Sequence, residues 1–185
     1  MIIGITGTLG AGKGTAVEYL KTKGFVDFSS SGILKEILAE KGLPATRKNL
    51  SELADELMKQ HQGGVLSISH ERAQKNGLEN YILEAIHRVD EANYVKSIGG
   101  IVWGVDADIE LRFERITKRK EGEKDNVTFE QFLADSKRED EGGTGTGPNI
   151  RAVLAISDHV FHSNGSKEEL YVEVEEALQE AGFKA

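Results

Sequence analysis

Five glycines and one lysine stand close together near the start of the chain, in the stretch GITGTLGAGKGT (residues 4–15). Glycines let a backbone turn through unusual dihedral angles and approach an anion without Cβ atoms in the way. The N–H groups of such a loop and the positive end of a following helix both attract phosphate oxygens. Lys13 adds a charge that can follow the β- and γ-phosphates of a nucleotide. This stretch therefore predicts a triphosphate site.

The phosphate-loop pattern G-x-x-x-x-G-K-[ST] is matched at Gly7, Gly12 and Lys13. The residue after the lysine is Gly14, and the hydroxyl follows one place later at Thr15. A short apolar run precedes the loop and predicts a buried strand, and a helical pattern follows it. A strand, a phosphate loop and a helix in this order favour a phosphate site over a surface turn.

Apolar runs alternate with helical patterns along the rest of the chain. We expect five strands separated by helices, with a helical insert between the second and third strands and a mobile flap after the fourth. The strands are expected at 2–6, 25–29, 81–86, 101–106 and 159–163. The insert covers 31–76, the flap covers 121–150, and further helices are expected at 90–100, 107–120 and 167–182. Such alternation favours a parallel sheet between two helix layers, because parallel strands need crossover connections. Ligands of these sheets bind at the carboxyl ends of the strands.

Composition excludes several classes of protein. The formal charge of −8 offers no basic field for a nucleic-acid polymer, and no apolar run is long enough to span a bilayer. The absence of cysteine excludes disulfides and thiolate metal sites. We expect a cytoplasmic protein of one globular domain without nucleic-acid or membrane partners; its oligomeric state is open, with a monomer slightly favoured.

The variant loop GKGT resembles that of adenylate kinase and its nucleoside monophosphate kinase relatives, which read G-x-P-G-x-G-K-G-T; Leu9 stands at the family's proline. The resemblance implies a three-layer P-loop NTPase fold in which 1–185 is one kinase domain, the insert binds the phosphoryl acceptor and the flap is a lid. It also implies Mg²⁺ as cofactor, near Thr15. The residues expected to bind ATP through the loop are Gly10, Ala11, Gly12, Lys13, Gly14 and Thr15.

Two further segments resemble the acceptor side of these kinases. SSSGILK (29–35) is similar to S-T-G-D-x-L-R, which places Ser31 in the acceptor site and Lys35 where the family has a phosphate-binding arginine. We also place Arg47 in the expected acceptor site, because the insert offers few other cations.

The third strand ends in EAIHR (84–88), which resembles D-G-F-P-R. This puts Glu84 at the acidic position, as an acceptor or magnesium ligand, and Arg88 at the arginine; a neighbouring register puts His87 there instead.

Arginines on the helix 107–120 extend the resemblance. Arg112, Arg115 and Arg119 are spaced three and four apart and share one face. In the kinases an R-x-x-x-R segment stacks on adenine with its first arginine and grips phosphates with its second, which implies these roles for Arg115 and Arg119. The later cluster SKRED implies that Arg138 or Lys137 closes over the transferred phosphate.

The C-terminal segment SDHVFHSNGSKEEL (157–170) resembles a different relative, dephospho-coenzyme A kinase. There the turn after the last strand borders the adenine, which implies that role for Asn164, Gly165 and Ser166. That enzyme carries an aspartate pair after its second strand, where this chain has Ser29 and Ser31. A hydroxyl acceptor that needs a carboxylate base would lack it at these positions.

These patterns predict an ATP-dependent kinase that phosphorylates a nucleoside monophosphate, with Lys13, Arg88, Arg119 and Arg138 as its catalytic set. One alternative is a kinase of dephospho-coenzyme A or another small metabolite, with Glu84 as base. The other is an ATP-binding switch or assembly factor without such activity. Asp106 would then be a Walker-B aspartate, although a cap on the following helix is the favoured role.

Overall fold

The structure of the chain, a computed structural model, describes residues 1–119, 127–142 and 148–183. Its centre is a sheet of five strands in the order β2-β3-β1-β4-β5, and every neighbouring pair is parallel. The strands are β1 (Ile2–Gly7), β2 (Val26–Phe28), β3 (Tyr81–Glu84), β4 (Ile101–Asp106) and β5 (His159–His162). The parallel five-stranded sheet predicted from the alternating pattern is confirmed.

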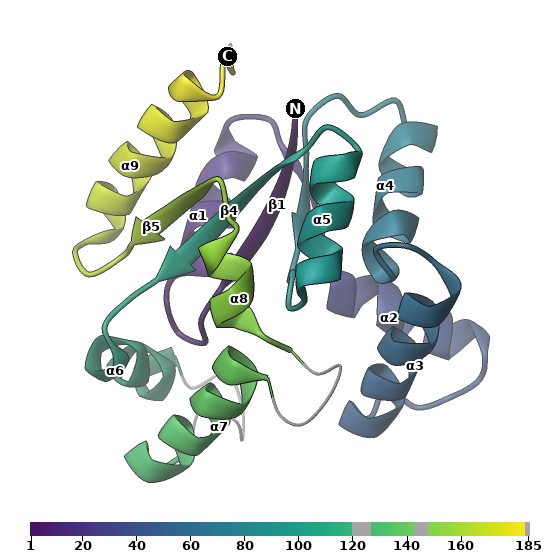
Figure 1. The fold of residues 1–185 in the computed structure, drawn as a ribbon, viewed down its shortest axis with the longest axis horizontal. Helices are drawn as coiled ribbons and strands as arrows, with labels where there is room; N and C mark the ends of the chain where they lie inside the picture. The colour runs from purple at the N-terminus through teal and green to yellow at the C-terminus, as the bar shows by residue number, and fades with distance from the viewer. Residues whose placement is uncertain (120–126, 143–147, 184–185) are drawn as a thin grey trace.

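Helices cover both faces of this sheet (Figure 1). On one face lie α1 (Lys13–Thr22) and α9 (Lys167–Glu180), and on the other α5 (Val89–Ser97) and α8 (Ile150–Ala155). The insert between β2 and β3 consists of α2 (Ser30–Glu40), α3 (Arg47–Gln60) and α4 (Val65–Lys75), whereas α6 (Ile109–Arg119) and α7 (Phe129–Glu141) follow β4. The predicted three-layer arrangement and helical insert are therefore present.

The two faces of the sheet belong to two hydrophobic clusters, because successive strand residues point to opposite sides. In β3, Ile82 packs toward α1 and α9, whereas Leu83 packs toward the insert and α5. Both side chains are fully buried, and burial of each stabilises the fold by about 1.5–3 kcal/mol. The loops at the strand ends thus rest on a packed core.

Strand β3 is two residues shorter than predicted because the chain turns sharply after Glu84. Ala85 has φ of 64°, a left-handed conformation that side chains other than glycine rarely adopt. The turn is held on its far side, since the Ile86 N–H donates to the Ile5 carbonyl and the Thr6 hydroxyl donates to the Ile86 carbonyl. It brings residues 84–88 to the end of β1.

Part of the predicted flap 121–150 forms α7, which lies below α8 in Figure 1. Phe113 of α6 contacts Phe129 and Phe132 of α7 edge-on or tilted, with ring centroids 5.1 and 5.5 Å apart. The charged run 120–126 and the glycine-rich tract 143–147 lie outside the described residues. Within the described ranges no helix combines the length and apolar character needed to cross a membrane.

Candidate active site

The phosphate loop joins the end of β1 to the start of α1 and depends on its glycines. Gly10 and Gly12 have φ of 82° and 105°, which favour glycine. A Cβ on Gly10 would also lie 2.6 Å from the Arg112 carbonyl oxygen. At Gly14 an added Cβ would meet no atom of the chain within 4 Å. Two of the loop glycines are therefore fixed by backbone geometry, and Gly14 leaves open space beside Lys13.

The neighbouring strand β4 holds the loop in place. The Thr8 N–H donates to the Val105 carbonyl over 3.2 Å, and the Thr8 hydroxyl donates to Asp106 Oδ1 over 2.7 Å. Asp106 also accepts from the Ala107 N–H and from Arg151 of α8. Its predicted role as a cap on the next helix is wrong, because α6 begins only at Ile109 and the carboxylate ties the loop to α8. These bonds fix the loop before any ligand binds.

A cavity of about 990 Å³ opens over the loop. The whole stretch 7–15 lines it, with Glu84 and His87 contributed by β3 and its turn, and Arg115 contributed by α6. The turn after β5 adds Gly165 and Ser166. Its size lies at the upper end of the range for small-molecule sites, about 300–1,000 Å³. A ligand here touches the phosphate loop and the carboxyl ends of three strands.

Lys13 and Glu84 meet in this cavity. Lys13 Nζ lies 3.8 Å from Glu84 Oε2, and the two side chains are 28% and 17% exposed. Thr15 lines the same cavity. Among the described residues no group of three or more His, Asp or Glu side chains forms a metal site. A hydroxyl and one carboxylate beside a phosphate site fit Mg²⁺, which usually takes one or two protein ligands together with phosphates and water.

Arg115 connects three parts of the cavity wall. Its guanidinium donates to the Ala11 carbonyl over 3.1 Å, to Ser163 Oγ over 3.4 Å and to the Gly165 carbonyl over 3.3 Å. The structure therefore brings this predicted ATP-binding arginine to the phosphate loop and to the turn after β5.

The other residues predicted in that turn have structural partners. The Asn164 side chain accepts from the Asp108 N–H over 2.9 Å, and the Ser166 hydroxyl accepts from the Glu169 N–H at the start of α9. Ser166 lines the cavity together with Gly165. Their contact with adenine stays a prediction.

Arg112 is buried, although it was predicted to share a helix face with Arg115 and Arg119: its residue surface is 1% exposed. Its Nε donates to the Leu9 carbonyl over 2.9 Å, its Nη2 to Ser136 Oγ over 2.7 Å, and its Nη1 lies 3.5 Å from Asp140. Arg112 thus braces the phosphate loop against α7. The spacing of arginines alone carried no signal for this role.

Of the two arginines predicted to act from the lid, only Arg138 has a described side chain, and it is not among the residues lining the cavity. The side chain of Arg119, at the end of α6, lies outside the description. Arg138 is exposed on α7 and pairs with Asp135. Their roles over the transferred phosphate stay predictions.

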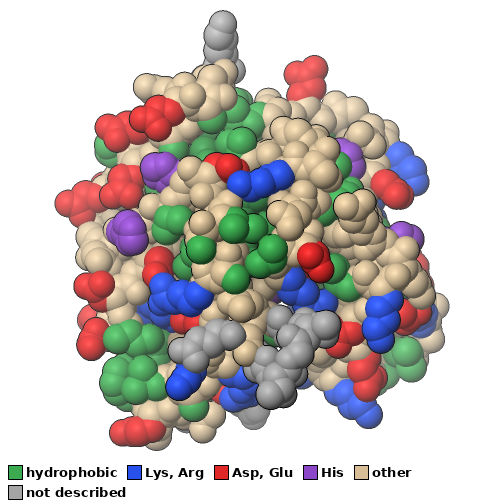
Figure 2. Space-filling view, in the orientation of Figure 1, with side chains coloured by type: hydrophobic (Ala, Val, Ile, Leu, Met, Phe, Trp, Pro, Cys, Tyr) green, Lys and Arg blue, Asp and Glu red, His purple; other side chains and the backbone are tan. Residues whose placement is uncertain are grey.

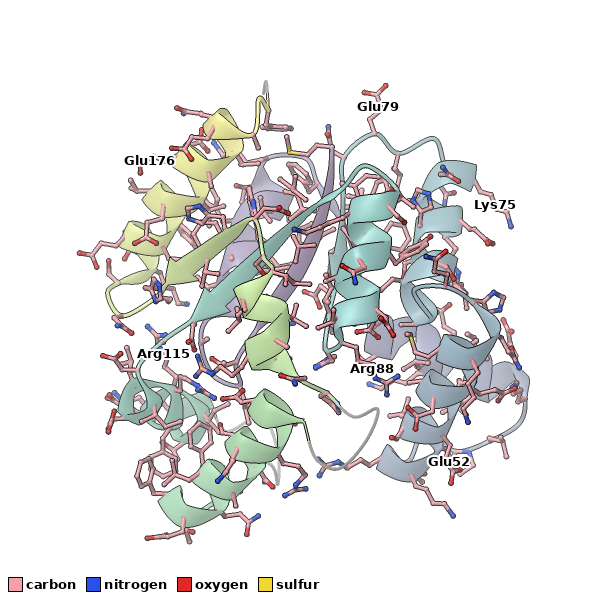
Figure 3. The ribbon with its side chains drawn as sticks, viewed as in Figure 1. Glu52, Lys75, Glu79, Arg88, Arg115 and Glu176 are labelled. Atoms are coloured by element: carbon pink, nitrogen blue, oxygen red, sulfur yellow. The ribbon has the colours of Figure 1, made fainter. Side chains whose placement is uncertain are left out.

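Among the residues predicted to bind the acceptor, Arg88 precedes the first residue of α5 and donates to Asp55 of α3 over 2.5 Å. Its side chain is 19% exposed. Figure 3 shows Arg88 and Arg115 on opposite sides of the edge where the strands end. The other predicted acceptor residues, Ser31, Lys35 and Arg47, are exposed on the insert outside the cavity lining, and their role stays a prediction.

Two residues near this edge have environments that were not predicted from the sequence, although His87 was offered there as an alternative to Arg88. His87 lines the cavity. Asp27, in the middle of β2, pairs in register with Ile82 and so shares a sheet face with Glu84. Burial, with the nearby Glu84 charge as a smaller cause, raises the pKa of Asp27 to about 6. The strand alternation could have placed Asp27 near Glu84, since the two side chains lie on one face of adjacent strands.

Charge is distributed unevenly over the surface. Figure 2 shows lysine and arginine side chains gathered over the lower half of one face, where the insert and the ends of the strands lie, and acidic side chains along the edge formed by α9. The chain carries a net charge of −8, so these cations form a local field rather than a general one. Such a field attracts an anionic ligand to the strand ends.

The region that carries the phosphate loop matches a known protein family. A family model described as an AAA domain matches residues 3–141, which include the phosphate loop, the insert and α7. The chain belongs to this AAA-domain family. Similar chains in this comparison are the UPF0200 proteins of Thermococcus kodakarensis and Methanocaldococcus jannaschii, each 27% identical. The alignments cover 97% of this chain, with 97% and 90% of the relatives.

Solved structures agree on the fold. TT1252 from Thermus thermophilus superposes with a TM-score of 0.63 at 21% identity, covering 97% of each chain. A shikimate kinase from Aquifex aeolicus superposes with a TM-score of 0.55 at 14% identity over the full length of both. The AAA-domain protein therefore has a P-loop kinase-like fold, as the sequence resemblance implied. The comparisons do not show membership of the adenylate kinase family.

Proposed function

We propose that the protein is an ATP-dependent kinase that transfers the γ-phosphoryl group of Mg-ATP to a nucleoside monophosphate. The observation that carries the proposal is the meeting of Lys13 and Glu84 in a cavity lined by the whole phosphate loop. A fixed cation, a carboxylate and oriented N–H groups are the parts that phosphoryl transfer requires, because its catalysis consists mainly of positioning and charge neutralisation.

On the donor side, the loop N–H groups and Lys13 bind the β- and γ-phosphates of ATP. Lys13 turns from Glu84 toward these phosphates, which leaves the carboxylate free to bind the cofactor with Thr15. Glu84 and Thr15 would hold Mg²⁺ there, and the ion would supply positive charge that offsets the charge of the phosphates. Arg115, held between the loop and the turn after β5, lies along the adenosine part of the site.

On the acceptor side, Arg88 binds the monophosphate after it leaves Asp55. This exchange couples acceptor binding to the insert, because Asp55 belongs to α3. Lys35, Arg47 and Ser31 complete the acceptor site when the insert moves toward the cavity. A monophosphate is already anionic, so attack on the γ-phosphorus needs no strong base. Arg119 and Arg138 then approach from the lid, which excludes water from the reaction.

The test measures ADP formation from Mg-ATP with ribo- and deoxynucleoside monophosphates and dephospho-coenzyme A, each supplied separately. One monophosphate should raise the rate by orders of magnitude, and Lys13→Ala should abolish that stimulation. Lys21→Ala is the matched control, because this lysine lies on the same helix as Lys13, pairs with Glu18 and is not among the residues lining the cavity. ATP binding without stimulation by any monophosphate would contradict the proposal.

A second candidate, phosphorylation of a neutral hydroxyl, is favoured by the two carboxylates near Lys13. Glu84 lines the cavity and can accept a hydroxyl proton, and the half-buried Asp27 shares its sheet face. The expected consequence is stimulation by dephospho-coenzyme A or another alcohol, lost in Glu84→Gln. ATP binding without transfer to any acceptor would instead support a nucleotide switch.

A further inference from the structure

His87 is held in the cavity wall by its backbone. It follows the left-handed Ala85 and the buried Ile86 at the end of β3. Its N–H donates to Glu91 Oε2 over 2.7 Å, and its carbonyl accepts from the Asn149 N–H over 2.8 Å. Strained conformations of this kind persist where the surrounding structure over-determines them, often at ligand sites. The backbone of His87 is thus fixed by contacts to α5 and to the start of α8.

Unlike the backbone of His87, its imidazole ring has a nitrogen without a hydrogen-bond partner in the described part of the chain. Its Nδ1 atom is buried and has no hydrogen-bond partner among the described residues. A buried polar nitrogen without a partner is uncommon in native proteins and destabilises the fold, so each case needs an explanation. Because His87 is one of the residues lining the cavity over the phosphate loop, a bound ligand can provide the missing partner.

The charges around the ring indicate the kind of ligand. Burial lowers the pKa of His87 to about 4, with Lys13 of α1 and the adjacent Arg88 as smaller causes, so the free protein holds a neutral imidazole at pH 7. The acidic side chains nearby are Glu84 of β3, Glu91 of α5, which already accepts from the backbone, and Glu139 of α7, which lines the same cavity. Two cations beside an uncharged donor form a site for phosphate oxygen.

We propose that His87 is a phosphate-binding residue of this cavity, whose Nδ1–H donates to an oxygen of the ATP γ-phosphate or of the acceptor phosphate. The inference rests on the proposed function, since it requires that phosphates occupy the cavity. The phosphate loop pattern assigns no role to this histidine, and the resemblance to adenylate kinase offered it only as an alternative to Arg88, without naming a donor atom.

Phosphate binding also changes the protonation of the ring. The negative charge of the ligand offsets Lys13 and Arg88, so the pKa of His87 rises on binding. A group whose pKa is higher in the complex takes up a proton on binding between its two pKa values, and the affinity increases as the pH falls through that window. Asp27 and the phosphates titrate in the same range, so only the difference between wild type and a His87 variant reports this proton.

The experiment is calorimetric titration of the full chain with two probes, a slowly hydrolysed Mg-ATP analogue and the stimulating nucleoside monophosphate. His87→Ala should raise the Kd at least tenfold for the probe that His87 contacts. His87→Asn, whose amide can occupy the Nδ1 position without titrating, should retain most of the affinity. His162→Asn is the control, because His162 is exposed at the end of β5 and is not among the residues lining the cavity.

Repeating the titration in two buffers of different ionisation enthalpy measures proton uptake. Wild type and His162→Asn should take up more protons than His87→Asn at pH 6. Unchanged Kd values for both probes in His87→Ala, with unchanged proton uptake, would overturn the inference. Binding that is insensitive to Lys13→Ala, or no binding of either probe to wild type, would overturn the proposed function as well.

Discussion

The two ends of the candidate site are built differently. At the donor end, the phosphate loop is tied to β4 through Thr8 and to α6 through Arg112 and Arg115. At the acceptor end, Arg88 is bound to Asp55, and Lys35 lies exposed on the insert. The proposed donor end is therefore already held by contacts of the free protein, whereas the proposed acceptor end would require ion pairs to exchange and helices to move. We infer that ATP binds to a preformed surface and that the acceptor organises its own site.

The same contrast exists within one helix. Arg112 and Arg115 are three residues apart on α6, and both donate to carbonyls of the phosphate loop. Arg112 is buried against α7, whereas Arg115 lines the cavity. Arg112 therefore stabilises the packing of the loop against α7, whereas Arg115 is accessible to a ligand in the cavity.

Replacing these two arginines gives the largest expected effect. Arg112→Met leaves the Leu9 carbonyl and Asp140 without their buried partner, which should lower the free energy of unfolding by about 3–5 kcal/mol. Arg115→Met should change it by less than about 1 kcal/mol but raise the Kd of an ATP analogue about tenfold. Urea unfolding and calorimetry separate the two effects. Equal losses of stability in both variants would contradict the contrast.

Arg88 tests the acceptor end. Arg88→Ala should raise the KM for the acceptor about 10–100-fold and leave the KM for ATP within about twofold, because a lost charge-assisted hydrogen bond amounts to about 1.5–3 kcal/mol. Arg72→Ala is the matched control, since Arg72 pairs with Glu36 on the exposed side of the insert. Steady-state kinetics with each substrate varied measures both constants. A larger effect on ATP than on the acceptor would place Arg88 at the donor end.

The pH dependence of stability tests Asp27. Its pKa of about 6 in the folded protein lies above the ordinary value of 3.8, so the unfolded state loses this proton first and stability falls as the pH rises between these values. Asp27→Asn has no carboxyl group at this position, so its stability does not fall with pH for this reason. It should be more stable than wild type by about 1 kcal/mol at pH 7.5, a value discounted for the partial exposure of Asp27, and equal to it near pH 4. A difference that does not change with pH would show that Asp27 is not protonated in this way.

The turn at Ala85 gives the smallest expected effect. Ala85→Gly relieves a left-handed conformation but adds flexibility to the unfolded chain, so the net gain should be about 0.5 kcal/mol. Thermal unfolding would show this as an increase in Tm of about 1–2 °C. A marked loss of stability would mean that the alanine methyl group packs usefully in the turn.

The sequence was informative where the structure depends on local patterns. The phosphate loop, the five parallel strands and the insert follow from glycine spacing, apolar runs and helical periodicity, and each is present. The environments of Arg112 and His87 were missed because they arise from contacts between segments distant along the chain. Asp27 was missed although the alternation of two adjacent strands could have placed it near Glu84. The spacing of Arg112 from Arg115 predicts a shared helix face, but it cannot show that α7 covers one of them.

The most direct test of the account is ³¹P NMR of the wild-type protein mixed with Mg-ATP and the acceptor that stimulates ADP formation. The spectrum distinguishes phosphoryl transfer from hydrolysis, because a phosphorylated acceptor and inorganic phosphate give separate signals. The account predicts that ADP and a nucleoside diphosphate appear in equal amounts and that Lys13→Ala produces neither. Release of inorganic phosphate with the acceptor unchanged would contradict it and would indicate an ATP-hydrolysing switch.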